Sequence, residues 1–124
     1  MGRILIIEDD ASIREMLARR LRLRGFTVAE AANGELGLVM VRESAPDVLI
    51  LDHGLPGISG WDVARTLRAE GFASLPIVAL TAHAGEPSRR DALAAGCTSF
   101  LTKPVDMKAL EAELRRHLGN GAGR

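Results

Sequence analysis

Three short apolar runs constrain the fold of this chain more than any other feature of its sequence. They are Ile4-Leu5-Ile6-Ile7, Val48-Leu49-Ile50-Leu51 and Ile77-Val78-Ala79-Leu80. Each run has the length of a β-strand, and none alternates with polar residues as a strand with one solvated face would. Such runs are typical of a parallel sheet that is covered on both faces. The more polar segments 26–30 and 98–101 are predicted as strands at the edges of the sheet.

Amphipathic helical patterns separate the predicted strands. Apolar residues recur at three- and four-residue spacing over roughly 12–24, 34–43, 61–70, 87–95 and 107–118. Glycines follow several of these patterns, and either Asp10 or Ser12 can cap the first helix. Because strand and helix alternate five times with short connections, we expect one doubly wound α/β domain over residues 1–119. Residues 120–124 are expected to form a flexible C-terminal tail.

Composition argues against several classes of protein. The 124 residues are 47% apolar and 26% charged, which is the balance of a globular domain rather than of a disordered chain. The 16 basic and 16 acidic residues cancel, so no positive field favours nucleic acid or a membrane surface. A single cysteine, Cys97, excludes an internal disulfide framework and is typical of a reducing compartment. No apolar run is long enough to span a membrane, and we expect a cytoplasmic location.

Polar residues follow four of the five predicted strands. Parallel strands place their carboxyl ends at one edge of the sheet, where α/β domains bind ligands. The residues concerned are Glu8, Asp9 and Asp10 after the first strand, Asp52 after the third, Thr81 after the fourth and Lys103 after the fifth. The second strand ends in nothing comparable. We therefore expect the polar side chains that follow the other four strands to form one site.

The chemistry of this set indicates phosphoryl transfer. Two unit charges about 4 Å apart repel by about 4 kcal/mol at an effective dielectric constant of 20, so clustered carboxylates need a cation. Oxygen ligands suit a hard ion such as Mg²⁺ or Mn²⁺. Asp52 would attack a phosphoryl group, the cations would gather its oxygens, and Thr81 would donate a hydrogen bond to one of them.

Each of these residues also has a simpler interpretation when it is taken alone. The three acids after the first strand could only cap the following helix and complement its dipole. Asp52 could be an ordinary loop acid, and Lys103 one half of a surface ion pair. Residues 11–25 hold five arginines, including Arg14, against Glu15 alone. That surplus is either a solvated helix face or a surface that steers the docking of a partner.

Four segments of the chain, in order and at the expected spacings, resemble the receiver domain of response regulators in two-component signalling. They are Ile4 to Asp10, Asp52 to Gly60, Thr81-Ala82, and Gly96 to Pro104. The resemblance spans residues 3–118 and is nearest to the stand-alone, CheY-like regulators that consist of a receiver without an output domain. It implies a flavodoxin-like fold with a five-stranded parallel sheet in the order 2-1-3-4-5.

The resemblance also implies a role for each site residue. The implied sets are Asp52 as phospho-acceptor; Glu8, Asp9, Asp52 and the Gly54 carbonyl as ligands of Mg²⁺; Thr81, the Ala82 N–H and Lys103 as phosphate-binding groups; and Phe100 as the switch aromatic. Gly54 and His83 occupy the two positions that tune the lifetime of the phosphoryl group in this family. The Lys103–Pro104 peptide is often cis in this family, which the sequence permits without requiring.

The family further implies the partners of such a domain. A histidine kinase or a histidine phosphotransfer protein would donate the phosphoryl group. A downstream protein would bind the face made by the fourth helix, the fifth strand and the fifth helix, without direct contact to nucleic acid or a membrane. The domain would catalyse only its own phosphorylation and dephosphorylation.

Three alternatives stay open beside this interpretation. The chain could be a receiver-domain fragment of a hybrid histidine kinase or of a DNA-binding response regulator. A flavodoxin-like cofactor-binding domain would share the fold, but it needs a phosphate-binding loop where this chain has three acids. An aspartyl-phosphate hydrolase would need a second acid two residues after Asp52, where this chain has Gly54.

Overall fold

The three apolar runs form the inner strands of a parallel sheet in the computed structural model, which describes residues 2–82 and 85–119. The inner strands are β1 (Arg3–Ile7), β3 (Val48–Asp52) and β4 (Ile77–Thr81), and the edge strands are β2 (Thr27–Ala31) and β5 (Ser99–Thr102). All four strand pairings are parallel, in the order β2-β1-β3-β4-β5. The predicted fold class and strand order are confirmed.

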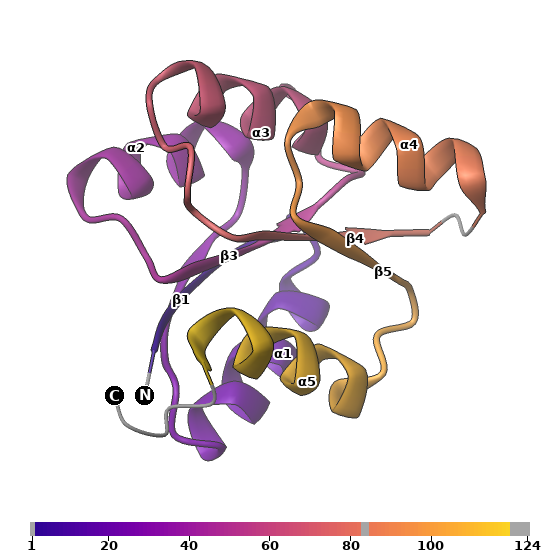
Figure 1. Ribbon diagram of the computed structural model, residues 1–124. Helices are drawn as coiled ribbons and strands as arrows, with labels where there is room; N and C mark the ends of the chain where they lie inside the picture. Colours follow the sequence, from indigo (N-terminus) through magenta and orange to yellow (C-terminus); the bar gives the residue numbers. More distant parts are fainter. Residues whose placement is uncertain (1, 83–84, 120–124) are drawn as a thin grey trace.

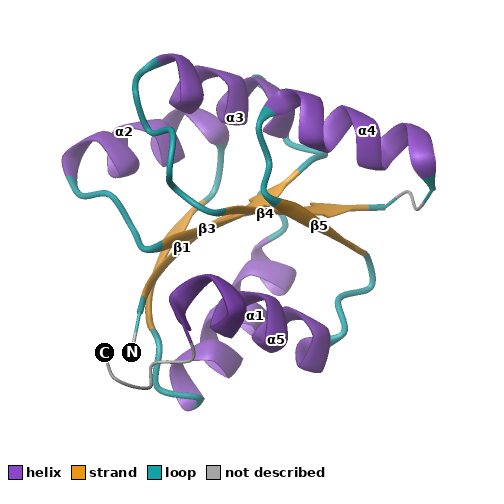
Figure 2. Cartoon of the chain, viewed as in Figure 1, coloured by secondary structure: helices purple, strands orange, loops and turns teal. Residues whose placement is uncertain are grey.

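Within residues 2–82 and 85–119, five helices cover the two faces of the sheet. Figure 1 shows α1 (Ala11–Leu23) and α5 (Met107–Leu118) on one face, and Figure 2 shows the same layers by type of secondary structure. The opposite face carries α2 (Gly34–Glu43), α3 (Gly60–Ala69) and α4 (Glu86–Ala95). The helices begin and end close to the predicted ranges, because the apolar stripe of each helix packs against the sheet.

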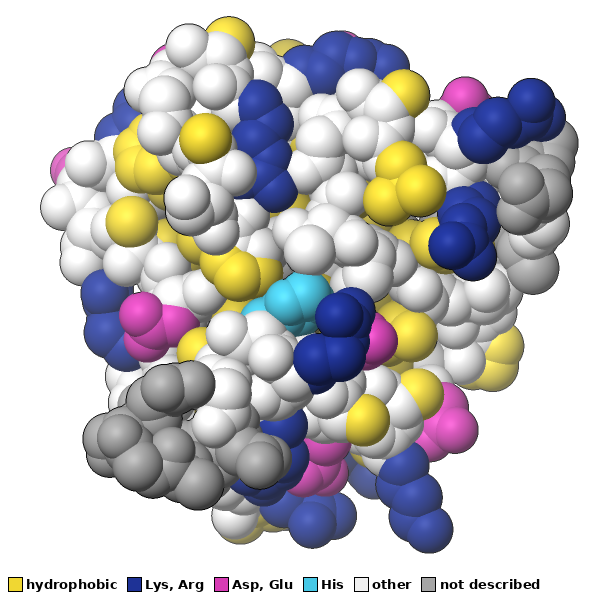
Figure 3. Space-filling model, in the orientation of Figure 1, with side chains coloured by type: hydrophobic (Ala, Val, Ile, Leu, Met, Phe, Trp, Pro, Cys, Tyr) yellow, Lys and Arg dark blue, Asp and Glu magenta, His cyan; other side chains and the backbone are white. Residues whose placement is uncertain are grey.

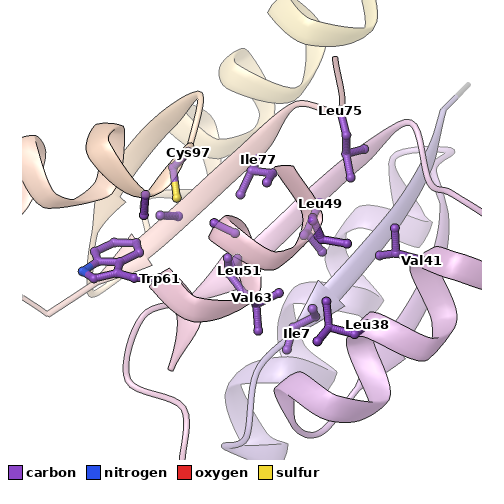
Figure 4. Packing of buried hydrophobic residues seen from close by; sticks show 14 of the residues in the cluster. Ile7, Leu38, Val41, Leu49, Leu51, Trp61, Val63, Leu75, Ile77 and Cys97 are labelled. Carbon is purple, nitrogen blue, oxygen red and sulfur yellow. The ribbon is translucent and has the colours of Figure 1, made fainter. Parts of the chain in front are cut away.

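The side chains of the strands divide into two apolar layers. Ile4, Ile6 and Ile50 belong to the cluster that packs under α1 and α5. The alternate residues belong to the cluster under α2, α3 and α4, which Figure 4 shows with Ile7, Leu49, Leu51 and Ile77 among its labelled members. Every residue of β3 and β4 is buried, whereas β2 and β5 are partly exposed. The contrast agrees with the prediction that continuous apolar runs are inner strands.

Side-chain caps mark the beginning of α1, α2, α3 and α5. Asp10 is the N-cap of α1, and its carboxylate accepts a hydrogen bond of 3.1 Å from the Ile13 N–H. Of the two candidates in the sequence, Asp10 is therefore the cap and Ser12 is not. Asn33, Ser59 and Asp106 cap α2, α3 and α5 in the same way.

The start of α3 lies directly against the end of β3. The Gly60 N–H donates to the His53 carbonyl at 3.2 Å. A Cβ atom at Gly60 would collide with the Asp52 carbonyl oxygen and would lie 2.9 Å from the His53 Cα. Since both neighbours are backbone atoms, only glycine permits this approach. The contact closes the loop between β3 and α3.

The surface carries charges of both signs. On the face seen in Figure 3, Lys and Arg side chains lie scattered among Asp and Glu rather than gathered in one positive field. Among the described residues, no helix has the length and apolar character that crossing a membrane requires.

Candidate functional site

The candidate site lies at the carboxyl-terminal ends of the parallel strands. Glu8 directly follows β1, Asp52 is the last residue of β3, and Thr81 is the last residue of β4. Lys103 follows the end of β5. Strands β1 and β3 are neighbours, and β2 lies on the far side of β1, so the acids flank the topological switch point of the sheet.

Three carboxylates meet at this point. Glu8, Asp9 and Asp52 each offer one oxygen, and the three oxygens lie within 4.8 Å of one another. Glu8 and Asp52 are buried, with 1% and 3% exposure, whereas Asp9 is exposed. Asp10 is not in this group, because its carboxylate caps α1. The structure therefore brings together three of the four predicted acids.

Lys103 is the positive charge of the cluster. Its Nζ lies 2.7 Å from Asp52 Oδ1 and 3.2 Å from Glu8 Oε1. The backbone N–H of Lys103 donates a hydrogen bond to the Thr81 carbonyl at 2.7 Å. The peptide bond between Lys103 and Pro104 is cis. One ammonium group faces three carboxylates, so the cluster carries excess negative charge whenever all three are ionised.

The electrostatics of the cluster appear most clearly at Glu8. Burial, together with the neighbouring charge of Asp52, raises the pKa of Glu8 from 4.5 to about 7, although the Asp10 N–H and Lys103 stabilise its anion. Burial alone would lower the pKa of Lys103, but Asp52 and Glu8 outweigh it and hold that pKa above its ordinary value. Lys103 thus stays charged at neutral pH while Glu8 is poised between its two states.

The donor set fits a hard divalent cation. Glu8 Oε2 accepts from the Asp10 N–H at 3.1 Å. The buried Oε1 atom forms an ion pair with Lys103 Nζ at 3.2 Å, but it makes no hydrogen bond of normal geometry within the described part of the chain. A buried oxygen without a hydrogen bond, beside two further carboxylates, is the arrangement that a bound cation would satisfy. The ligands are all oxygen atoms, as Mg²⁺ and Mn²⁺ prefer.

The acids open into a cavity of about 400 Å³. Its lining consists of Glu8, Asp9, Asp10, Ile13, Asp52, His53, Gly54, Ala82 and Lys103. A Cβ atom at Gly54 would lie 4.0 Å from Asp52 Oδ2, so position 54 directly adjoins the proposed acceptor carboxylate. Ala82, which directly follows Thr81, lines the same cavity.

Thr81 and Phe100, the two residues predicted for a switch, differ in how deeply they are buried. Thr81 is buried, with 1% exposure. Phe100 is half-buried on β5 and packs against the cluster under α2, α3 and α4. His83 and the predicted tail at 120–124 lie outside the described residues.

Two histidines and the cysteine make contacts that account for them without a role in catalysis. The His53 ring stacks on Trp61 with 4.2 Å between the ring centroids, and it also lines the cavity. His117 lies 3.5 Å from Glu113 on α5. Cys97 is buried, and burial raises the pKa of its thiol to about 12, which leaves it unreactive at neutral pH.

Sequence reasoning missed a link between α1 and the second strand. Arg14 Nη1 donates to the Glu8 carbonyl at 2.9 Å, and Arg14 Nε lies 3.3 Å from Glu30 Oε1 on β2. The second strand therefore contributes to the site indirectly, because Glu30 binds Arg14 and Arg14 binds the Glu8 backbone. The only signal in the sequence is an acid near the end of the second strand and an arginine on the first helix, and that pair does not reveal their contact.

With this geometry in place, the chain can be assigned to a class. The family model described as "Response regulator receiver domain" matches residues 4–115, and the chain belongs to that family. It is a CheY-like receiver domain of two-component systems. Receiver domains of this family are signalling switches.

Individual relatives refine this assignment. The chain is 40% identical over 121 residues to the transcriptional regulatory protein AfsQ1 of Streptomyces coelicolor, covering 98% of this chain and 53% of AfsQ1. It is 42% identical over 116 residues to the DNA-binding response regulator MtrA of Mycobacterium tuberculosis, covering 94% of this chain and 50% of MtrA. The chain thus spans about half the length of these curated relatives.

A solved structure supports the same fold. The chemotaxis protein CheY4 of Vibrio cholerae superposes with a TM-score of 0.88 at 29% identity, covering 94% of this chain and 98% of that one. In fold alone, the receiver domain of the Francisella response regulator 1452 is similar, with a TM-score of 0.92 at 21% identity and coverage of 97% and 98%.

Proposed function

We propose that this domain is a phosphorylation-dependent switch and that Asp52 is its phospho-acceptor. The observation that carries the proposal is the position of the Asp52 carboxylate. It is buried at the end of β3, lies 2.7 Å from the ammonium of Lys103, and belongs to the three-acid cluster with Glu8 and Asp9. In the transfer, an Asp52 oxygen forms a bond to phosphorus while the phosphorus–nitrogen bond of a phosphohistidine breaks. The departing imidazole keeps the bonding electron pair.

Glu8, Asp9, Asp52 and the Gly54 carbonyl would hold Mg²⁺ or Mn²⁺ in this proposal. The bound ion would supply positive charge that offsets the carboxylates and the incoming phosphoryl oxygens. Lys103 contributes a second, permanent positive charge beside Asp52. The protein itself therefore contributes the nucleophile, its orientation and part of the charge neutralisation.

Phosphorylation would be read through Thr81 and Phe100. In the proposal, Thr81, the Ala82 N–H and Lys103 bind phosphoryl oxygens, and Phe100 turns inward as Thr81 moves toward the phosphate. Phe100 pairs in register with Ala79 on β4, two residues before Thr81. This pairing supports a route by which a shift at the end of β4 would reach β5. The face made by α4, β5 and α5 would then bind the downstream protein.

The lifetime of the phosphoryl group would depend on two positions. Gly54 lies beside Asp52 Oδ2 and offers no side chain to the phosphoryl group. His83, the second position, would orient or obstruct an attacking water. In this proposal, the domain would catalyse only its own phosphorylation and dephosphorylation.

A histidine kinase or a histidine phosphotransfer protein is the proposed donor. The curated relatives favour a second candidate for the whole protein, because MtrA is a DNA-binding response regulator about twice as long as this chain. The receiver would then control a DNA-binding half, and contact with DNA would belong to that half. The mass of the native protein, 13.3 kDa or about twice that, distinguishes the two candidates.

Intact-mass spectrometry tests the proposal directly. The wild type and Asp52→Asn are incubated with acetyl phosphate, with Mg²⁺ or with EDTA. We expect one added phosphoryl group only on the wild type and only with Mg²⁺. Addition to Asp52→Asn would assign the acceptor to another residue. If neither protein reacts, the same comparison with a phosphorylated histidine phosphotransfer protein decides whether Asp52 is an acceptor at all.

A further inference from the structure

Both polar groups of the Glu8 backbone are held from the β2 side of the sheet. The Glu8 N–H donates to the Ala31 carbonyl at 3.1 Å, and the Glu8 carbonyl accepts from Arg14 Nη1 at 2.9 Å. Glu30, the residue before Ala31, lies 3.3 Å from Arg14 Nε. A chain of contacts therefore runs from Glu30 on the edge strand, through the Arg14 guanidinium, to the peptide group that joins Glu8 to Asp9.

The Arg14 side chain is largely enclosed rather than free on the surface of α1. It is 15% exposed, and its partner Glu30 is 25% exposed. Nε and Nη1 of a guanidinium point in fixed directions within one plane, so two partners bound to them restrict its orientation strongly. Such a group is poorly suited to search for a docking partner and well suited to hold a neighbouring backbone group in place.

We propose that Arg14 is a positioning residue for the divalent cation at the acid cluster. This inference rests on the proposed function, in which Glu8 and Asp9 hold Mg²⁺. The peptide unit between them is planar, so fixing its carbonyl limits the directions in which the chain leaves toward both side chains. Through that carbonyl, Arg14 keeps the two carboxylates directed at Asp52, and Glu30 keeps Arg14 in place.

The sign of the effect separates positioning from simple charge. If Arg14 acted only as a nearby positive charge, its removal would strengthen Mg²⁺ binding, because the guanidinium repels the cation. If Arg14 positions Glu8 and Asp9, its removal weakens Mg²⁺ binding, because the ligands must be ordered when the ion binds. Partners that orient metal ligands are typically worth 10- to 100-fold in affinity.

Arg22 is a matched control on the same helix. Its Nη2 lies 3.2 Å from Glu30 Oε2 and donates to the Val28 carbonyl at 2.8 Å. Like Arg14, Arg22 pairs with Glu30 and donates to a backbone carbonyl. Within the described part of the chain, it makes no hydrogen bond or ion pair with Glu8. Arg14→Met and Arg22→Met each remove one positive charge and keep an unbranched side chain.

The experiment is calorimetric titration of Mg²⁺ into the three folded, metal-free proteins. We expect Arg14→Met to weaken binding about tenfold or more and Arg22→Met to change it less than twofold. Unchanged or tighter binding by Arg14→Met overturns the inference, and so does an equal loss in both variants, which would trace the effect to Glu30 pairing alone. If Arg14→Met does not fold, Arg14→Lys replaces it. Lysine keeps the charge but cannot reproduce the fork to both partners, so unchanged affinity there also overturns the inference.

Two further measurements separate this inference from the proposed function. Asp52 phosphorylation of Arg14→Met by acetyl phosphate should return to the wild-type level when Mg²⁺ is raised well above its dissociation constant. A persistent deficit at saturating Mg²⁺ would contradict a role confined to positioning metal ligands. If the wild type itself binds no Mg²⁺, the proposed function fails first, and that result is visible before any variant is compared.

Discussion

Glu8 is a carboxylate with 1% exposure that shares the Lys103 ammonium group with Asp52. Its environment raises its pKa to about 7. Near neutral pH, the Glu8 carboxyl group of the metal-free protein is therefore either protonated and neutral or ionised and buried. A ligand for a cation must be ionised, whereas a metal-free core is more stable when the same group is neutral. At Glu8 the requirements of folding and of cation binding therefore oppose each other.

Glu8→Gln should accordingly stabilise the protein in EDTA, with an effect that depends on pH. The folded-state pKa of about 7 lies above the ordinary value of 4.5, so ionisation favours the unfolded chain between these two pH values. Below about pH 4.5 both states are protonated and the penalty is absent, and above pH 7 it is complete. We expect Glu8→Gln to be more stable than the wild type by about 1–3 kcal/mol at pH 8, and by much less at pH 5.

Urea denaturation of both proteins at pH 5 and pH 8 provides the measurement. Glutamine retains an oxygen that can accept from the Asp10 N–H, which limits other losses. A stability difference that is the same at both pH values would show that Glu8 ionises in the folded protein as it does in the unfolded chain.

The junction between β3 and α3 is built at the scale of whole elements. Gly60 brings the first turn of α3 against the backbone of Asp52 and His53. We expect Gly60→Ala to destabilise the domain by about 1–3 kcal/mol, although alanine is the better helix former, because the added methyl group must displace backbone. The displaced loop carries Gly54, so Mg²⁺ binding should weaken as well.

Gly37→Ala is a suitable control for this junction. Its Cβ atom would collide with the side chain of Ile7 in the buried core and not with backbone atoms. Chemical denaturation and Mg²⁺ titration of both variants give the comparison. Loss of stability in Gly37→Ala with unchanged Mg²⁺ affinity, beside loss of both in Gly60→Ala, is the expected pattern. Equal Mg²⁺ affinity in the two variants would mean that the junction does not position the site.

The elements themselves followed from the sequence because their signals are local. Continuous apolar runs predicted β1, β3 and β4, and the polar ends of these strands predicted which side chains meet. Contacts made by long side chains across elements could not be predicted in the same way. The reach of Arg14 from α1 to Glu8 and Glu30 depends on the tilt of the helix over β2. The sequence does not state that tilt.

At the scale of the whole molecule, the acids of the candidate site are attached to two neighbouring inner strands of the sheet. Glu8 and Asp9 follow β1, and Asp52 ends β3, and these neighbouring strands lie at the centre of the sheet. Four of the five residues of β1 and all of β3 are buried. The cluster is therefore dispersed by unfolding of the core rather than by the fraying of a loop.

Mg²⁺ should consequently raise the melting temperature of the entire domain. A ligand that binds only the folded state stabilises it by about 2.7 kcal/mol at a concentration 100 times its dissociation constant. For a domain of this size that corresponds to an increase of roughly 10 °C in the melting temperature. Calorimetric scans with Mg²⁺, and with NaCl at equal ionic strength, measure the shift. Asp9→Asn should abolish most of it, because Asp9 is an exposed member of the cluster whose loss leaves the core intact. A shift that persists in Asp9→Asn would mean that the ion stabilises the protein somewhere other than at the carboxyl ends of β1 and β3.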